Sequence, residues 1–206
     1  MASRRPEWSN LSYLDPAAEL MEARRRDRLR TPAEIQGRRA FFRKREGRAE
    51  KQRLEACLFA FGWSCATGLP ASVAMHELSD YDCVLRRGTE AGGEEHVPVQ
   101  LKELPPTRVD PDLDFGAMFR KLGKYVDSED LVVALYVNRR ISKCDLDSLL
   151  VSKPRLRELW ILGATSPAER QGGQEWSIVG SVTRPPKARV TCRFTYPDVN
   201  ASDEGT

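Results

Sequence analysis

Hydrophobic and polar positions alternate along two neighbouring segments near the middle of the chain. Within residues 81–85 and again within 97–102, apolar side chains recur at every second position. This period of two indicates β-strands. A polar, glycine-rich segment, residues 88–95, lies between them and predicts a turn, so the two strands are expected to form a hairpin.

The rest of the chain predicts helices and strands in alternation. Asp15 is a candidate N-cap and Pro16 a first helical residue for a helix over 16–30, and Thr31 can cap the next. That second helix spans about 32–61, with Leu54, Cys57 and neighbours forming an apolar stripe, and is expected to end at Gly62. Further helices are predicted at 113–126 and 145–150, and strands at 131–137, 159–162, 176–179 and 190–194.

This order of elements predicts one α/β (α+β mixed) domain with helices on the faces of a mixed central β-sheet. We divide the 206 residues into a basic helical arm (1–45), the domain (46–196) and a disordered acidic tail (197–206). No apolar run approaches the roughly 20 residues of a membrane span, so no membrane association is expected. Five scattered cysteines without a CxxC pair favour reduced thiols, and hence a cytoplasmic protein.

Positive charge is concentrated near the N-terminus. Residues 23–53 contain thirteen Lys and Arg and four acids, a net charge of +9, whereas the whole chain carries +3. Such a basic segment suits the phosphate backbone of nucleic acid, although a solvated helix surface has the same composition. The residues expected to contact nucleic acid are Arg24, Arg25, Arg26, Arg38, Arg39, Arg43, Lys44 and Arg45.

The predicted hairpin gathers polar side chains of complementary chemistry. Gln100 and Lys102 are two residues apart and leave the same side of their strand, and Asp82 belongs to the neighbouring strand. A carboxylate and an amide oxygen are ligands for a hard cation such as Mg²⁺ (or Mn²⁺), to which a backbone carbonyl could be added. A lysine beside the metal could orient water and stabilise the charge that develops on a phosphodiester.

Asp82 followed by Gln100-Leu101-Lys102 resembles the motif of the PD-(D/E)xK nuclease superfamily, in which the strand carrying Asp precedes one carrying (Asp/Glu/Gln)-x-Lys. The segment from Gly47 through Glu50 to Gly62 is similar to the preceding helix of that family. The resemblance covers about residues 45–165 and implies a restriction-endonuclease-like core. It also implies a metal-dependent endonuclease acting on DNA, or less often RNA.

The resemblance assigns Asp82 and Gln100 to the metal, Lys102 to the water or the transition-state charge, and Glu50 to a second metal or the water network, with Glu55 in reserve. Gln100 replaces an acid, which lowers the charge of the site, and family members of this kind include active and degraded enzymes. Two hypotheses therefore stand: a nuclease, or a catalytically inactive nuclease-like fold that binds nucleic acid or protein. The polar helical arm is also a plausible contact of a homodimer.

Overall fold

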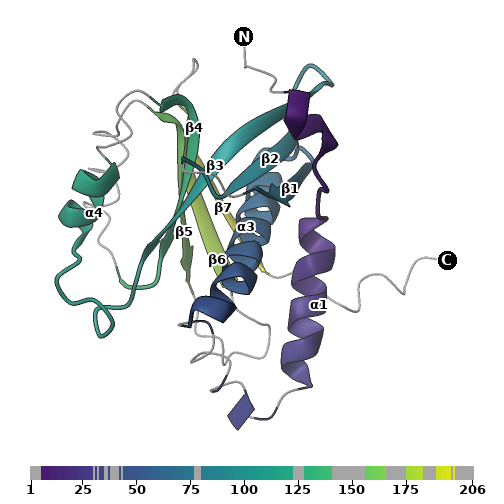
Figure 1. Cartoon of the computed structure of the whole chain (residues 1–206). Helices are drawn as coiled ribbons and strands as arrows, with labels where there is room; N and C mark the ends of the chain where they lie inside the picture. Colours follow the sequence, from purple (N-terminus) through teal and green to yellow (C-terminus); the bar gives the residue numbers. More distant parts are fainter. Residues whose placement is uncertain are drawn as a thin grey trace.

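The computed structural model describes residues 6–29, 31, 33–34, 37, 42, 44–76, 80–122, 128–140, 156–165, 175–182, 189–195 and 197. Its centre is a curled seven-stranded mixed sheet in the order β1-β2-β3-β4-β5-β6-β7 (Figure 1). The strands are β1 (Ala71–Met75), β2 (Cys83–Gly88), β3 (Glu94–Leu104), β4 (Ser128–Val137), β5 (Leu156–Ala164), β6 (Glu175–Val182) and β7 (Arg189–Thr195). The helices are the 3-10 helix η1 (Pro6–Asn10), α1 (Pro16–Arg28), α3 (Arg45–Thr67) and α4 (Phe115–Leu122).

The direction of the strands changes twice across the sheet. Strands β1, β2 and β3 are antiparallel, β3, β4 and β5 are parallel, and β5, β6 and β7 are again antiparallel. The parallel step from β3 to β4 contains α4, as a crossover connection requires. The predicted α/β class and the hairpin of residues 81–102 are therefore confirmed.

Each face of the sheet has its own hydrophobic core. Helix α3 lies in the hollow of the curled sheet with α1 beside it, and α4 covers the opposite face (Figure 1). Val99 and Leu101 of β3 pack on the α3 side, whereas Leu104 packs on the α4 side with Leu113 and Met118. Alternate residues of β3 therefore serve opposite faces, which places Gln100 and Lys102 on the α4 side.

The predicted start of α1 is confirmed. The Asp15 carboxylate accepts hydrogen bonds from the backbone N–H groups of Ala17 and Ala18, at 2.9 and 3.3 Å, and satisfies two otherwise unpaired donors. Thr31 accepts from the backbone N–H of Glu34, whose carboxylate accepts from the Thr31 backbone in return, which is a capping box. The long second helix predicted over about 32–61 does not begin there, however, because α3 starts at Arg45, after Lys44, which makes no side-chain cap bond.

The predicted end of the second helix is wrong. Helix α3 continues through Gly62 to Thr67 and ends at Gly68, which adopts a left-handed conformation with φ of 71°. Gly62 serves packing, because a Cβ there would lie 2.7 Å from the ring of Phe194 in β7. Strand β1, which follows α3, was not predicted.

Several sequence predictions lie outside the described residues. They are the helix at 145–150, the C-terminal part of the helix at 113–126 and the acidic tail after residue 197. In the part of the chain that is described, no helix is both long and apolar enough to cross a membrane.

A buried network of ion pairs joins β2, β3 and β5. The Arg87 guanidinium donates two hydrogen bonds to Glu158, at 2.9 and 2.7 Å, and one to Glu95 at 2.7 Å. Arg157 pairs with Glu95, and the Trp160 indole N–H donates to Glu158 at 2.7 Å. Each of these charges has a partner of opposite charge, because an unpaired charge is costly to bury. The network therefore links β2, β3 and β5 through their side chains.

Candidate functional site

Asp82 lies immediately before β2, opposite β3. Its backbone N–H donates to the carbonyl of Val99 at 2.9 Å, which continues the hairpin by one residue. One carboxylate oxygen, Oδ2, accepts from the backbone N–H of Leu101 at 2.7 Å and from the side-chain amide of Gln100. The other oxygen, Oδ1, accepts one long bond of 3.5 Å from Gln52 of α3. The hairpin thus joins Asp82 to Gln100, as the sequence predicts.

Asp82 also lines a pocket of about 580 Å³ at the N-terminal end of α3. Its other walls are Arg26 of α1, Met75 of β1, and Ala49, Glu50, Gln52 and Arg53 of α3. The structure therefore places Glu50, the preferred helix acid of the sequence prediction, in the same pocket as Asp82. Two arginines share this pocket with the two carboxylates.

Lys102 does not line the Asp82 pocket. It lies two residues beyond Gln100 on the same side of β3 and is half-buried. Asp82 and Glu50 line the pocket and Asp82 is bonded to Gln100, but the Gln100 side chain, like that of Lys102, belongs to the α4 side of β3 and does not line the pocket. Lys102 lies along the strand from Gln100, by about 7 Å at the usual rise per residue.

A second group of charged residues lies on the α3 side of β3, next to this site. Lys51 of α3 forms an ion pair with Glu103 of β3 and lies 3.5 Å from Glu55, one helical turn further along α3. Glu103 also accepts a hydrogen bond of 2.6 Å from the Asn138 side chain. The group of Lys51, Glu55 and Glu103 therefore ties the first turns of α3 to the end of β3.

Burial has a strong effect on Glu55. Loss of solvent raises the pKa of its carboxyl to about 7, and the negative charges of Glu103 and Asp82 act in the same direction. Lys51 opposes the shift by attraction but does not cancel it. Near neutral pH this carboxyl is divided between its protonated and charged forms, so it can donate or accept a proton beside the pocket.

Sequence reasoning did not include Lys51, Gln52 or Glu103 in the site. Lys51 and Glu55 have the i,i+4 spacing of a helix ion pair, and this was a usable signal. Nothing in the sequence shows which turn of α3 faces the end of β3. Their grouping depends on how the helix crosses the sheet.

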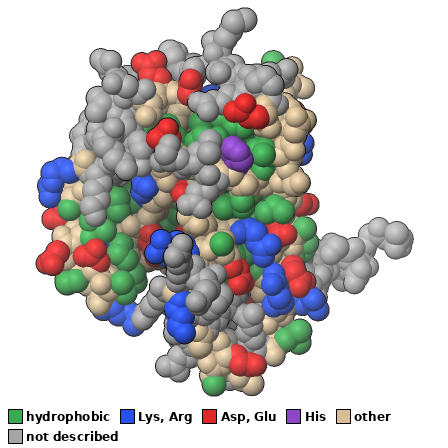
Figure 2. Space-filling model, in the orientation of Figure 1, with side chains coloured by type: hydrophobic (Ala, Val, Ile, Leu, Met, Phe, Trp, Pro, Cys, Tyr) green, Lys and Arg blue, Asp and Glu red, His purple; other side chains and the backbone are tan. Residues whose placement is uncertain are grey.

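The basic arm is seen only in part. Arg25 and Arg26 both pair with Glu22, and Arg53 lies 3.6 Å from Glu19, so the acids of α1 hold these cations. On the face shown in Figure 2, Lys and Arg side chains lie near α1 and α3 among acidic ones. Arg24 is half-buried in α1 and Lys44 is exposed, whereas Arg38, Arg39, Arg43 and the Arg45 side chain lie outside the described residues.

The donor atoms of the site fit a hard cation that keeps much of its own water. Oδ1 of Asp82 has one weak partner and retains a free lone pair, and Glu50 offers a second carboxylate in the same pocket. In the described ranges, no three His, Cys, Asp or Glu side chains gather closely enough to enclose a metal ion. A cation here would therefore have few protein ligands.

Comparison of the chain with protein-family models, with curated proteins and with solved structures gives no match.

Proposed function

We propose that this protein is a divalent-metal-dependent phosphodiesterase of the PD-(D/E)xK type, with a restriction-endonuclease-like core, that cuts DNA or RNA. The observation that carries the proposal is the joining of Asp82 to Gln100 across the hairpin, with Glu50 in the pocket that Asp82 lines. A carboxylate oxygen, joined by the amide oxygen of Gln100 once that amide is turned over, would suit Mg²⁺ or Mn²⁺. The arrangement of helix α3, antiparallel β1-β2-β3 and parallel β4 supports the same family.

Asp82, Gln100 and Glu50 are the residues that would hold the metal. The side-chain amide of Gln100 points its nitrogen at Asp82. Rotation of this amide by 180° would put its oxygen there instead, as a metal ligand requires. When bound, a divalent cation would polarise the phosphodiester and lower the pKa of a water molecule. The protein would contribute orientation of that water and stabilisation of the charge on the phosphate.

Two lysines are candidates for that stabilising role. Lys102 is the residue that the motif assigns, and it shares a strand side with Gln100. Lys51 lies on the other side of β3, where it pairs with Glu103 and Glu55. A substrate phosphate that approached Lys51 would have to compete with these two carboxylates, so the proposed role of Lys51 is to position the site.

Arg26 and Arg53 are placed to guide the substrate. Both line the Asp82 pocket, and both are held by acids of α1. Arginines fixed in this way suit contact with phosphate oxygens, which gives affinity without reading sequence. Binding would therefore weaken steeply with rising salt.

The test is cleavage of plasmid DNA, single-stranded DNA and RNA by the full chain with Mg²⁺, with Mn²⁺ and with a chelator. The variants are Asp82→Asn, Glu50→Gln, Lys102→Met and Lys51→Met, and Asp80→Asn is the matched control, since Asp80 is exposed two residues before Asp82. We expect metal-dependent cleavage that falls at least about a hundredfold in Asp82→Asn, the scale on which single catalytic groups act, and is unchanged in Asp80→Asn. Cleavage that is equal in Asp82→Asn and wild type, or that survives the chelator, would overturn the proposal.

A second function is favoured by one observation. Oδ2 of Asp82 is already bonded to Leu101 and Gln100, which is the arrangement of a structural carboxylate. A nuclease-like fold that binds nucleic acid without cutting it would give salt-sensitive binding in the same samples and no cleavage with either metal. The two lysine variants would then change affinity alone.

A further inference from the structure

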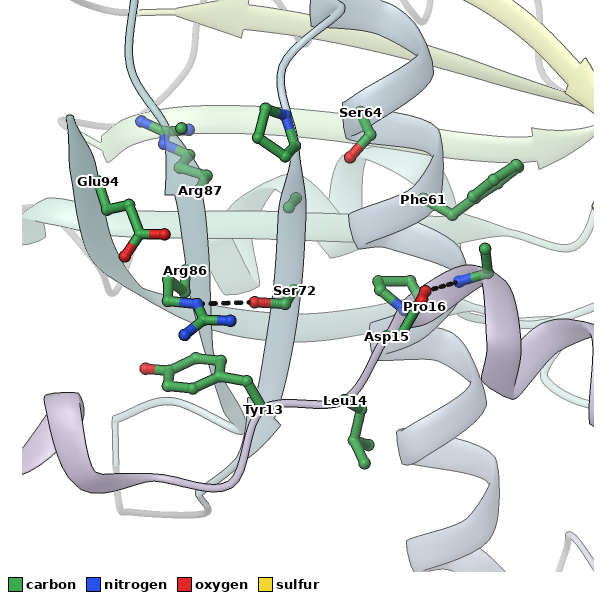
Figure 3. A pocket seen from close by; sticks show the side chains of 14 residues that line it. Tyr13, Leu14, Asp15, Pro16, Phe61, Ser64, Ser72, Arg86, Arg87 and Glu94 are labelled. Atoms are coloured by element: carbon green, nitrogen blue, oxygen red, sulfur yellow. Dashed lines mark hydrogen bonds between the residues drawn. The ribbon is translucent and has the colours of Figure 1, made fainter. Parts of the chain in front are cut away.

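A second pocket lies at the opposite end of the α1-α3 pair from Asp82. It has a volume of about 500 Å³, between the start of α1, the later turns of α3 and the edge formed by β1 and β2. Leu14, Pro16, Phe61 and Pro70 contribute apolar walls, and Arg86 of β2 contributes a positive charge (Figure 3). A pocket of this size, mostly apolar with a few polar groups, is typical of a small-molecule site.

Arg86 is held in a fixed orientation. Its Nε donates to the Ser72 hydroxyl at 3.0 Å, and its guanidinium carbon lies 4.6 Å from the centre of the Tyr13 ring (Figure 3). The Tyr13 hydroxyl in turn donates to the carbonyl of Trp8 at 2.9 Å. The Nε bond and the ring contact leave the two terminal nitrogens of the guanidinium as donors for a further partner.

The charge of Arg86 has no carboxylate partner within ion-pair distance in the part of the chain that is described. Its neighbour Arg87 differs, because Glu95 and Glu158 neutralise it. Asp15 lines the pocket but is engaged at the start of α1, and burial raises the pKa of Tyr13 to about 12, so that its hydroxyl stays neutral. Glu94 is exposed at the rim.

We propose that this pocket binds a small organic anion, whose phosphate or carboxylate group pairs with Arg86 and whose apolar part lies against Phe61, Pro16 and Pro70. The Arg86 guanidinium is oriented by Ser72 and Tyr13, has no carboxylate partner among the described residues, and its two terminal nitrogens match a phosphate or carboxylate. The apolar walls exceed what a bare inorganic ion would use. This site is separate from the Asp82 pocket and requires no metal.

The test is titration of the full chain with phenyl phosphate, benzoate and neutral benzamide, by calorimetry in the presence of a chelator. The chelator removes any contribution of the proposed metal site, so this experiment is independent of nuclease activity. We expect one molecule of an anion per chain and at least about tenfold weaker binding of benzamide, as for loss of one charge-assisted contact. The relative affinities of phenyl phosphate and benzoate show which anionic group is preferred.

Three variants identify the pocket. Arg86→Gln is expected to weaken anion binding at least about tenfold, whereas Glu94→Gln strengthens it by removing a repelling charge. Ser64→Phe fills the pocket from α3 without altering Arg86 and is expected to abolish binding. Arg108→Gln, at an exposed position that lines neither pocket, is the matched control and leaves affinity unchanged.

Circular dichroism establishes that each variant is folded before it is titrated. No anion binding at millimolar concentration, equal affinity for benzamide, or unchanged affinity in folded Arg86→Gln would each overturn the proposal. Because Glu94→Gln and Ser64→Phe leave the Arg86 contacts intact, opposite changes in these two variants support it even if Arg86→Gln fails to fold.

Discussion

Trp160 of β5 lies directly opposite Gly180 of β6, and its indole fills the space where residue 180 lacks a side chain. A Cβ at position 180 would lie 2.2 Å from the indole ring. Trp160 is fully buried and contacts Phe59 of α3 with ring centres 6.4 Å apart. The glycine therefore makes room for the Trp160 indole between β6 and helix α3.

Gly180→Ala is expected to destabilise the protein by about 2 kcal/mol or more, because the indole must move out of a close-packed position. Gly163→Ala is the matched control, since a Cβ there would meet its nearest atom, the Val137 carbonyl oxygen, at an ordinary 3.5 Å. Urea unfolding followed by tryptophan fluorescence measures both. Equal stabilities of the two variants would contradict this account of the packing.

Arg87→Met is expected to cost about 3–5 kcal/mol, because it leaves the buried carboxylate of Glu158 without its main counter-charge. Arg25 forms an ion pair with Glu22 at the exposed surface, where solvent screens the charges, so Arg25→Met should leave the free energy of unfolding almost unchanged. Chemical denaturation of the two variants beside wild type tests the contrast. A small effect of Arg87→Met would mean that the network contributes little to stability.

The pKa of Glu55 predicts a pH dependence of stability. Because burial raises this pKa from 4.5 to about 7, the folded state favours the protonated carboxyl. Its stabilising contribution is complete below pH 4.5 and is lost as the pH rises through about 7. The free energy of unfolding of wild type minus that of Glu55→Gln should therefore fall across this window, by on the order of 3 kcal/mol. A difference that is constant with pH would exclude the raised pKa.

Asp82 is expected to stabilise the hairpin as well as serve the proposed site. Asp82→Ala removes the acceptor of the Leu101 N–H and the Gln100 amide, at a cost of about 1–3 kcal/mol, whereas Asp82→Asn keeps an oxygen acceptor and costs less. Thermal unfolding of the two variants without metal measures this order. If Asp82→Ala and Asp82→Asn were equally stable, the hydrogen bonds to the Asp82 side chain would not contribute to stability. Asp82→Ala would then suit the cleavage assay equally well.

The sequence was sufficient where local rules determine structure. Alternation of apolar residues predicted the hairpin, and the register that places Asp82 beside Gln100 follows from pairing those two strands. The N-cap Asp15 was found because its preference depends on a few neighbouring residues. These features need no knowledge of distant segments.

What was missed depends on contacts between distant segments. Glycine is the residue type that often ends a helix, which is why Gly62 was expected to do so. Its role depends instead on Phe194, which packs against it and lies more than 130 residues later in the chain. Strand β1 has only five residues, too few to show a clear alternation. Its identity as a strand depends on its pairing with β2. The same holds for Lys51 and Glu103, which meet only because α3 crosses the end of β3.

The course of α3 through the hollow of the curled sheet has a consequence for biosynthesis. The helix is anchored by α1 and β1 near the beginning of the chain and, through Phe61 and Gly62, by Phe194 of β7 near its end. A ribosome-bound chain lacking residues 189–195 cannot close this side of its interior, so the last step of folding must wait until β7 has been synthesised. Until then the exposed flank of the helix is a surface for chaperones to shield.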